Sequence, residues 1–167
     1  MSSDFSIAVQ IVLKNEGGLE TNSLDSGGIT NFGISQSFLN SYRIDALAQD
    51  VTESDAIAIY HDYFWNKYNI GSIANQDLAN KVFDVVVNMV PYEAIFLLQS
   101  IVNDYFLGTL VEDGALGPKT AFAINICKMP EILEKYKAAL VTHYENIVSA
   151  KPSLNVFLDG WIARANE

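Results

Sequence analysis

The stretch from residue 15 to residue 33 reads NEGGLETNSLDSGGITNFG. It contains five of the ten glycines of the chain, together with the acids Glu16, Glu20 and Asp25. Glycine permits tight turns and lets the backbone come close to a ligand. In a chain that is 50% hydrophobic, an early loop of this kind is either an ordinary turn between helices or a functional element.

The residues before this loop predict a helix. Apolar side chains recur from Phe5 to Leu13 at the i, i+3, i+4, i+7 and i+8 spacing, and Gly17–Gly18 ends the helix. Glu16 lies four residues after Val12, so it continues the row that faces the core. We therefore expect its carboxyl at the end of the helix, partly removed from water.

This position suits Glu16 to general acid catalysis. Burial and the negative end of the helix dipole both disfavour an ionised carboxylate, and a protonated acid can donate to a leaving group. Asp25 follows on a polar loop where it ionises easily, and Thr30 offers a hydroxyl to hold a water. Two carboxyls in contrasting environments are what glycoside hydrolysis uses. The plain alternative is a solvated helix end followed by an aspartate that forms a turn.

The rest of the chain predicts a mainly α fold. Thr52 and Asp55 have the spacing of a capping box, and residues 78–90 are apolar almost all round, as in a buried helix. The segment from Pro130 to Ala150 is long and amphipathic, and residues 157–165 predict a short last helix. Strand signals are confined to the glycine-rich loop, where residues 27–33 are expected to pair with residues near Glu20 in a short hairpin. Prolines mark three expected helix starts, at Pro91, Pro118 and Pro130.

Charge and composition exclude several classes of protein. The net charge of −10 argues against nucleic-acid binding and against an anionic membrane surface. Cys127 is the only cysteine, so no internal disulfide forms, and neither a signal peptide nor a membrane span is expected. His61 and His143 lack the spacing of metal ligands, and we expect no metal and no cofactor.

The glycine-rich loop resembles the signature of glycoside hydrolase family 108, a family of bacterial and phage N-acetylmuramidases. That signature runs Glu-Gly-Gly-aromatic, then Asp-x-Gly-Gly-x-Thr-Asn-x-Gly-Ile. The resemblance continues through YHDYFWNKY and VFDVVVNMV. LLQSIVN, EDGALGPKTAFAI and FLDGWIARA are similar to the helical peptidoglycan-binding module that follows in this family. Leu19 departs from the signature at the aromatic position, and NMVPYEA lacks a usual glycine.

The resemblance implies a lysozyme-like helical fold with a short β-hairpin in the active-site loop. It implies a catalytic part over residues 1–92 and a peptidoglycan-binding-like part over residues 93–167, packed as one unit. The implied reaction is hydrolysis of the β-1,4 bond between N-acetylmuramic acid and N-acetylglucosamine. Glu16 aligns with the catalytic glutamate, with Asp25 and Thr30 beside it.

Further side chains are expected to line the substrate cleft. Asp84 and Asn88 are polar residues one turn apart on an otherwise apolar helix, where unsatisfied groups cost about 1–3 kcal/mol each. Bonding to a neighbouring helix end is an equally good explanation of this pair. Trp65 is a candidate for stacking on a sugar, although core packing also explains an aromatic there. The expected substrate-binding set is Asn31, Tyr60, Trp65, Asp84 and Asn88.

The expected partner is the glycan strand of peptidoglycan. Because this polymer is itself anionic, affinity is expected to come from contacts inside a cleft. We expect synthesis in the cytoplasm and action in the periplasm or at the wall, after delivery by a phage holin or a secretion apparatus. The competing hypothesis is a non-catalytic protein of lysozyme-like fold that binds peptidoglycan or belongs to a secretion system.

Overall fold

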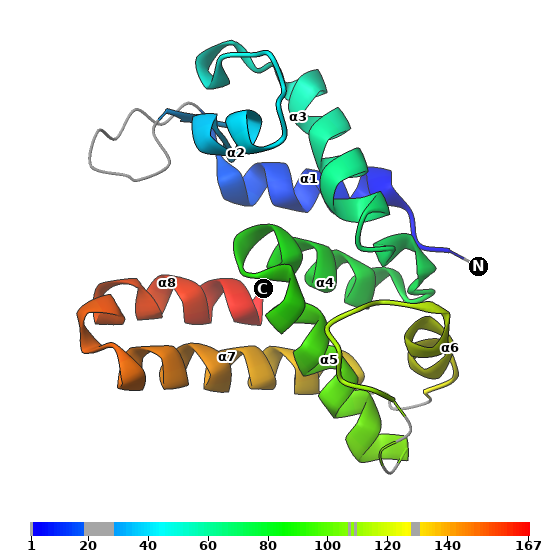
Figure 1. Ribbon diagram of the computed structural model, residues 1–167. Coiled ribbons are helices and arrows are strands. Elements are labelled where there is room, and N and C mark those ends of the chain that lie inside the picture. Colours follow the sequence, from blue (N-terminus) through cyan, green and yellow to red (C-terminus); the bar gives the residue numbers. More distant parts are fainter. Residues whose placement is uncertain (1, 19–28, 107, 109, 128–130) are drawn as a thin grey trace.

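The computed structural model describes residues 2–18, 29–106, 108, 110–127 and 131–167. Helices form most of the described structure (Figure 1), which confirms the expected mainly α fold. None of the described helices is long and apolar enough to cross a membrane. The helices are α1 (Phe5–Glu16), α2 (Gln36–Ser41), α3 (Glu53–Tyr60), α4 (Gln76–Asn88), α5 (Pro91–Phe106), α6 (Pro118–Ile126), α7 (Ile132–Ala150) and α8 (Asn155–Asn166).

Short helical turns connect several of these helices. A π-helical segment continues directly from α3, and single 3-10 turns lie before α3, before α4 and between α7 and α8. Their bounds are η1 (Ala48–Asp50), η2 (His61–Asn66), η3 (Ile70–Ser72) and η4 (Pro152–Leu154).

A two-stranded antiparallel hairpin follows the glycine-rich loop. Strand β1 (Thr30–Asn31) pairs with β2 (Ile34–Ser35), with Thr30 opposite Ser35. The connecting residues Phe32 and Gly33 both have positive φ values, of 49° and 75°. Two consecutive residues of this kind form the tight turn that suits a two-residue hairpin. The hairpin is therefore present but pairs forward along the chain, while the expected partner segment near Glu20 lies outside the described residues.

Local signals set the helix ends where the structure describes them. The side chain of Asp4 accepts a hydrogen bond from the backbone N–H of Ser6 and caps α1. Thr52 and Asp55 form the expected capping box, in which each side chain accepts from the other residue's backbone N–H. Two of the three prolines that were expected to begin helices do so, since Pro91 is the first residue of α5 and Pro118 is the first residue of α6. The third, Pro130, lies outside the described residues.

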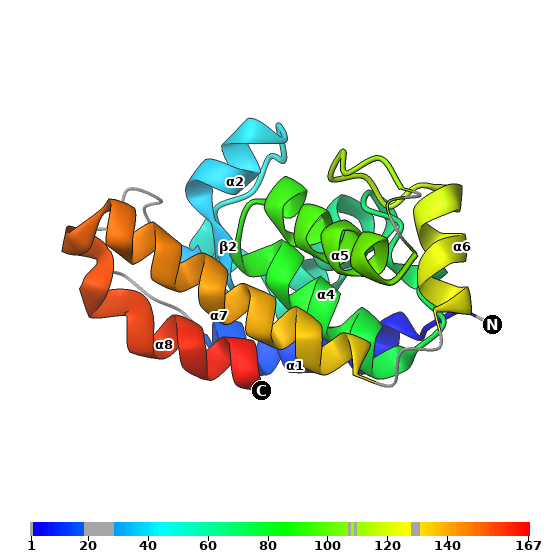
Figure 2. The same ribbon diagram turned by 90° about the horizontal axis from the view of Figure 1, so that it is seen from below.

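Helix α4 is the centre of the fold. It lies between α1 on one side and the antiparallel pair of α7 and α8 on the other (Figure 1), and it contacts α1, α5 and α7. Figure 2 shows the same layers from below, with the end of α8 beside α1. Eight of the thirteen residues of α4 are buried, including the charged pair Lys81 and Asp84. Residues 78–90 were expected to form a buried helix, and α4 matches that expectation up to its end at Asn88.

Aromatic rings fill the space between α1, η2 and α4. Trp65 is 5% exposed and meets Phe5 and Phe83 edge-on, with ring centroids 5.6 and 5.2 Å away. A Cβ atom on Gly71 would lie 3.0 Å from the indole Nε1, so the chain also closes tightly over this ring. Edge-on packing of this kind adds to the stability already gained from burying aromatic surface.

The expected division of the chain at residues 92 and 93 falls inside the first turn of α5. Helix α5 begins three residues after the end of α4 and packs against both α4 and α7. The two proposed parts therefore meet along packed helices and not across an open linker.

Removing one ring from the aromatic cluster tests this packing. Phe83→Ala is expected to lower the free energy of unfolding by about 3–5 kcal/mol, because it leaves a cavity next to Phe5 and Trp65. Chemical denaturation measures the change. Phe122→Ala is the control, since Phe122 is 65% exposed on α6. Equal effects of the two substitutions would contradict the packing described here.

Candidate active site

Glu16 is the last residue of α1. Gly17 follows with a φ of 69°, and its N–H donates to the carbonyl oxygen of Leu13 at 3.2 Å. A positive φ is easily adopted by glycine, so the helix stops at this point. The side chain of Glu16 is 19% exposed, which places its carboxyl at the surface but largely covered.

The hairpin turn packs directly on the stem of Glu16. A Cβ atom on Gly33 would lie 2.8 Å from Cβ and Cγ of Glu16 and would also collide with the hydroxyl of Tyr60. That hydroxyl donates to the carbonyl oxygen of Phe32 at 2.8 Å. Burial, and then the charge of Glu16, raise the pKa of Tyr60, so the phenol keeps its proton and remains a donor. Only glycine fits between these groups.

A guanidinium group from the last helix reaches the carboxyl of Glu16. Arg164 on α8 places Nη2 2.5 Å from Glu16 Oε1 and 2.9 Å from Asp84 Oδ1. Its Nε also lies 3.2 Å from each carboxylate oxygen of Asp84. Burial disfavours the charged guanidinium, but the hydrogen bonds and charges of Asp84 and Glu16 outweigh it and raise the pKa of Arg164. Arg164 therefore stays cationic and connects the two acids.

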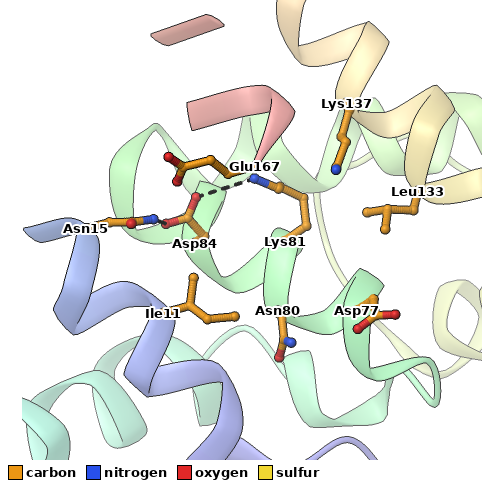
Figure 3. A pocket seen from close by; sticks show the side chains of 9 residues that line it. All are labelled: Ile11, Asn15, Asp77, Asn80, Lys81, Asp84, Leu133, Lys137 and Glu167. Carbon is orange, nitrogen blue, oxygen red and sulfur yellow. Dashed lines mark hydrogen bonds and ion pairs between the residues drawn. The ribbon is translucent and has the colours of Figure 1, made fainter. Parts of the chain in front are cut away.

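Asp84 anchors this network from α4 and is only 2% exposed. Asn15 Nδ2 donates to Asp84 Oδ1 at 3.1 Å, and Lys81 Nζ lies 3.9 Å from Asp84 Oδ2. Figure 3 shows both contacts converging on the carboxylate. Lys81 also donates to the backbone oxygen of Arg164 at 2.7 Å, which fixes α8 against α4. Burial lowers the pKa of Lys81, with the charge of Asp84 acting in the opposite direction.

These contacts correct the expected surroundings of Glu16. The sequence predicted a carboxyl kept neutral by apolar neighbours, whereas the structure pairs it with a cation. Arg164 was also absent from the expected site. A signal for it existed, because a buried Asp84 requires a cationic partner and the chain has only ten lysines and arginines. Its identity was not readable, since Glu16 and Arg164 are 148 residues apart.

A cavity of about 210 Å³ opens beside Asp84 between α1, α4 and α7. Figure 3 shows the nine side chains that line it; the charged ones are Asp77, Lys81, Asp84, Lys137 and Glu167. Glu16 does not line this cavity. Acids and lysines of opposite charge face one another across it. The cavity is part of the charge network around Asp84, because Asp84 and Lys81 line it. The candidate reacting group is Glu16, which lies outside it.

The expected partners of Glu16 are only partly placed by the structure. Thr30 is half-buried on β1, in the hairpin whose turn packs on Glu16. Asn31 is 8% exposed, and its Nδ2 donates to the carbonyl oxygen of Val51 at 2.9 Å. This bond ties β1 to the residue that follows η1 and gives Asn31 a structural role. Asp25 lies outside the described residues.

Two aromatic residues of the expected substrate-binding set lie in the core. Tyr60 is 1% exposed, and Trp65 sits among Phe5 and Phe83. The packing leaves Trp65 no free face for a sugar ring, so core packing accounts for it. Asn88, by contrast, is exposed at the end of α4, one helical turn beyond Asp84.

No metal-binding arrangement is present among the described residues, where no group of three or more His, Cys, Asp or Glu side chains is placed to hold an ion. His61 instead lies 2.7 Å from Asp62 through Nδ1, on the exposed side of η2.

Comparisons with known proteins cover almost the whole chain. Residues 9–89 match the family described as Glycosyl hydrolase 108, and residues 93–166 match the one described as Predicted Peptidoglycan domain. No curated protein matches the sequence. Among solved structures, the chain is similar to Brucella abortus SagA, with a TM-score of 0.78 and 24% identity over 97% of this chain and 89% of that chain. This likeness concerns the fold and agrees with the expected lysozyme-like helical architecture.

The charge network makes a direct prediction for Asp84. Asp84→Ala is expected to lower the free energy of unfolding by about 3–5 kcal/mol, because it leaves Arg164 and Lys81 buried without their shared partner. Urea denaturation gives the value, with Asp159→Ala as control because Asp159 is exposed on α8. A loss below about 1 kcal/mol for Asp84→Ala, in the range of an exposed ion pair, would show that the network is not needed for folding.

Proposed function

Because the chain belongs to glycosyl hydrolase family 108, we propose that it is an N-acetylmuramidase in which Glu16 is the general acid. The family and the peptidoglycan domain support a peptidoglycan-related glycoside hydrolase. The proposed bond is the β-1,4 link between N-acetylmuramic acid and N-acetylglucosamine. The observation that carries this proposal is the position of Glu16, where the end of α1, the hairpin turn and α8 meet at one partly exposed carboxyl.

In this mechanism Glu16 protonates the oxygen of the leaving sugar. Arg164 contacts Oε1 of the carboxyl, so Oε2 is the oxygen that carries the proton in this mechanism. Arg164 is then a positioning residue that fixes the direction of the carboxyl, and the Gly33 contact limits the movement of its stem. Holding an acid in one orientation is worth a large part of the rate in such reactions.

Asp25 and Thr30 complete the proposed site. A second carboxylate either directs a water at the sugar or stabilises the positive charge that develops there. The hairpin position of Thr30, in the element that contacts Glu16 through Gly33, supports its inclusion. Their proposed roles follow from the polar loop that holds Asp25 and from the hydroxyl that Thr30 offers to a water.

One observation favours a second candidate, a protein that binds peptidoglycan without cleaving it. Arg164 lies 2.5 Å from Glu16, as in an ion pair with a carboxylate, and a carboxylate cannot donate a proton. For hydrolysis, a proton must reach Glu16 despite this ion pair. In either case the net charge of −10 supports affinity through close contacts and delivery to the wall by a holin or a secretion apparatus.

The experiment that separates the two functions is lysis of purified peptidoglycan by wild type and Glu16→Gln. The variant keeps the size of the side chain but cannot donate a proton as an acid, so we expect a loss of about 10²–10⁴-fold in rate. Turbidity follows the reaction. Glu145→Gln is the matched control, because Glu145 is exposed on α7, and it should lyse at the wild-type rate.

The other outcomes are informative too. Equal lysis by wild type and Glu16→Gln removes Glu16 from the mechanism. Binding of wild type to the pelleted wall without any lysis supports the non-catalytic protein. Mass spectrometry of the soluble products identifies the bond, because a muramidase leaves reducing N-acetylmuramic acid ends, a glucosaminidase leaves reducing N-acetylglucosamine, and a lytic transglycosylase leaves anhydro ends.

A further inference from the structure

A second cavity, of about 500 Å³, lies between the end of α4, the start of α5, α7 and α8. We call it the Trp161 pocket. Its volume is within the range of about 300–1,000 Å³ that is typical of small-ligand sites. The lining residues on which the argument depends are Asn88, Glu93, His143, Tyr144 and Trp161.

The Trp161 pocket and the Glu16 network use the same two helices, α4 and α8. Asn88 follows Asp84 by one turn of α4, and Trp161 precedes Arg164 by one turn of α8. Tyr144 lines the pocket and also lies close enough to Arg164 and Asp84 for their charges to affect its pKa. Burial raises the pKa of its phenol, and its charged neighbours are Arg164 and Asp84, so the back of the pocket lies within electrostatic reach of the ion pair. Two residues that line the pocket are therefore each about one helical turn from a member of the Glu16 network.

One wall of the pocket belongs to a row of aromatic rings that runs from the interior to the surface. Trp161 lies 5.4 Å from Tyr144 and 5.8 Å from Phe157, measured between ring centroids, with interplanar angles of 31° and 21°. Exposure increases along this row, from 5% at Tyr144 to 53% at Phe157. Partly exposed aromatic surface beside a cavity is a common mark of a binding site.

The polar groups of the pocket restrict the class of ligand. The amide of Asn88, the carboxylate of Glu93 and the imidazole of His143 offer hydrogen bonds next to the apolar wall. A purely apolar ligand would leave these groups unsatisfied, and an anionic ligand would meet Glu93 and a protein of net charge −10. A neutral N-acetylated sugar fits the pocket. Its ring face and methyl group suit the apolar wall, and its hydroxyl and amide groups suit the polar side chains.

We propose that the Trp161 pocket binds an N-acetylated sugar of the glycan strand, next to the bond held at Glu16. The position of this sugar relative to the cleaved bond rests on the proposed function, in which that bond lies at Glu16. Trp161 and its aromatic neighbours contact the ring, and Asn88 bonds to the substituents. The segment that matches a predicted peptidoglycan domain then supplies most of the residues that line this subsite.

Binding of tetra-N-acetylchitotetraose to the Glu16→Gln protein tests this proposal, because this variant removes the proposed acid and leaves binding to be measured alone. Calorimetry gives the dissociation constant for this parent and for the parent carrying Trp161→Ala or Asn88→Ala. Each added substitution is expected to weaken binding about fivefold to tenfold. Tyr105→Ala is the matched control, since Tyr105 is 47% exposed at the far end of α5, and it should bind as the parent does.

Asn88→Ala keeps the test valid if Trp161→Ala unfolds, because the Asn88 side chain is exposed and is not part of the core. Unchanged affinity in both variants, or no binding of the oligosaccharide to the parent, overturns the proposal. The same titration with a free stem pentapeptide forms the second arm. If the variants lose peptide binding and keep oligosaccharide binding, the pocket belongs to the peptide and the sugar assignment is wrong.

This result is separable from the test of the proposed function. Lysis by wild type but not by Glu16→Gln, together with unaltered oligosaccharide binding in the Trp161 and Asn88 variants, supports the hydrolase and rejects the pocket. Loss of oligosaccharide binding in these variants, together with no lysis by wild type, supports the pocket and rejects the hydrolase.

Discussion

The arrangement of this protein depends on one largely covered cation, Arg164, that two acids share. Arg164 comes from the last helix, Asp84 from the central helix and Glu16 from the end of the first helix. A guanidinium removed from water is costly unless its donors are matched, and a carboxylate as buried as Asp84 has the same requirement. The chain meets both requirements only when its two ends fold against α4. The ion pair therefore forms only in the folded arrangement of α1, α4 and α8. It also fixes the position of Glu16, the group that is proposed to react.

This condition changes how the two halves of the chain are understood. Two family matches that break between residues 89 and 93 suggest a catalytic part followed by a separate wall-binding part. In the structure, the second segment supplies Arg164 to the first and lines the Trp161 pocket beside it. Lys81 reinforces the connection by bonding to the backbone of α8. The two segments therefore share one ion-pair network, and the proposed site takes residues from both of them.

Features set by neighbouring residues were readable from the sequence, and features set by distant contacts were not. The capping box at Thr52 and Asp55, the proline at the start of α5, and Glu16 at the end of α1 all follow from spacing within a few residues. The cation beside Glu16 did not follow, because no local pattern connects positions 148 residues apart. The two tryptophans differ for the same reason. Both lie in helical segments, and only packing decides that Trp65 is buried while Trp161 borders a cavity.

The most direct test of this account is the rate of peptidoglycan cleavage by Arg164→Ala, measured with and without added ethylguanidinium. If the guanidinium orients Glu16, the rate falls by about two orders of magnitude, in keeping with the cost of misplacing a catalytic group. Ethylguanidinium then restores part of it, and the Glu16→Gln/Arg164→Ala double variant gains nothing. A variant that is folded by circular dichroism and cleaves at the wild-type rate would contradict the claim that α8 belongs to the active site.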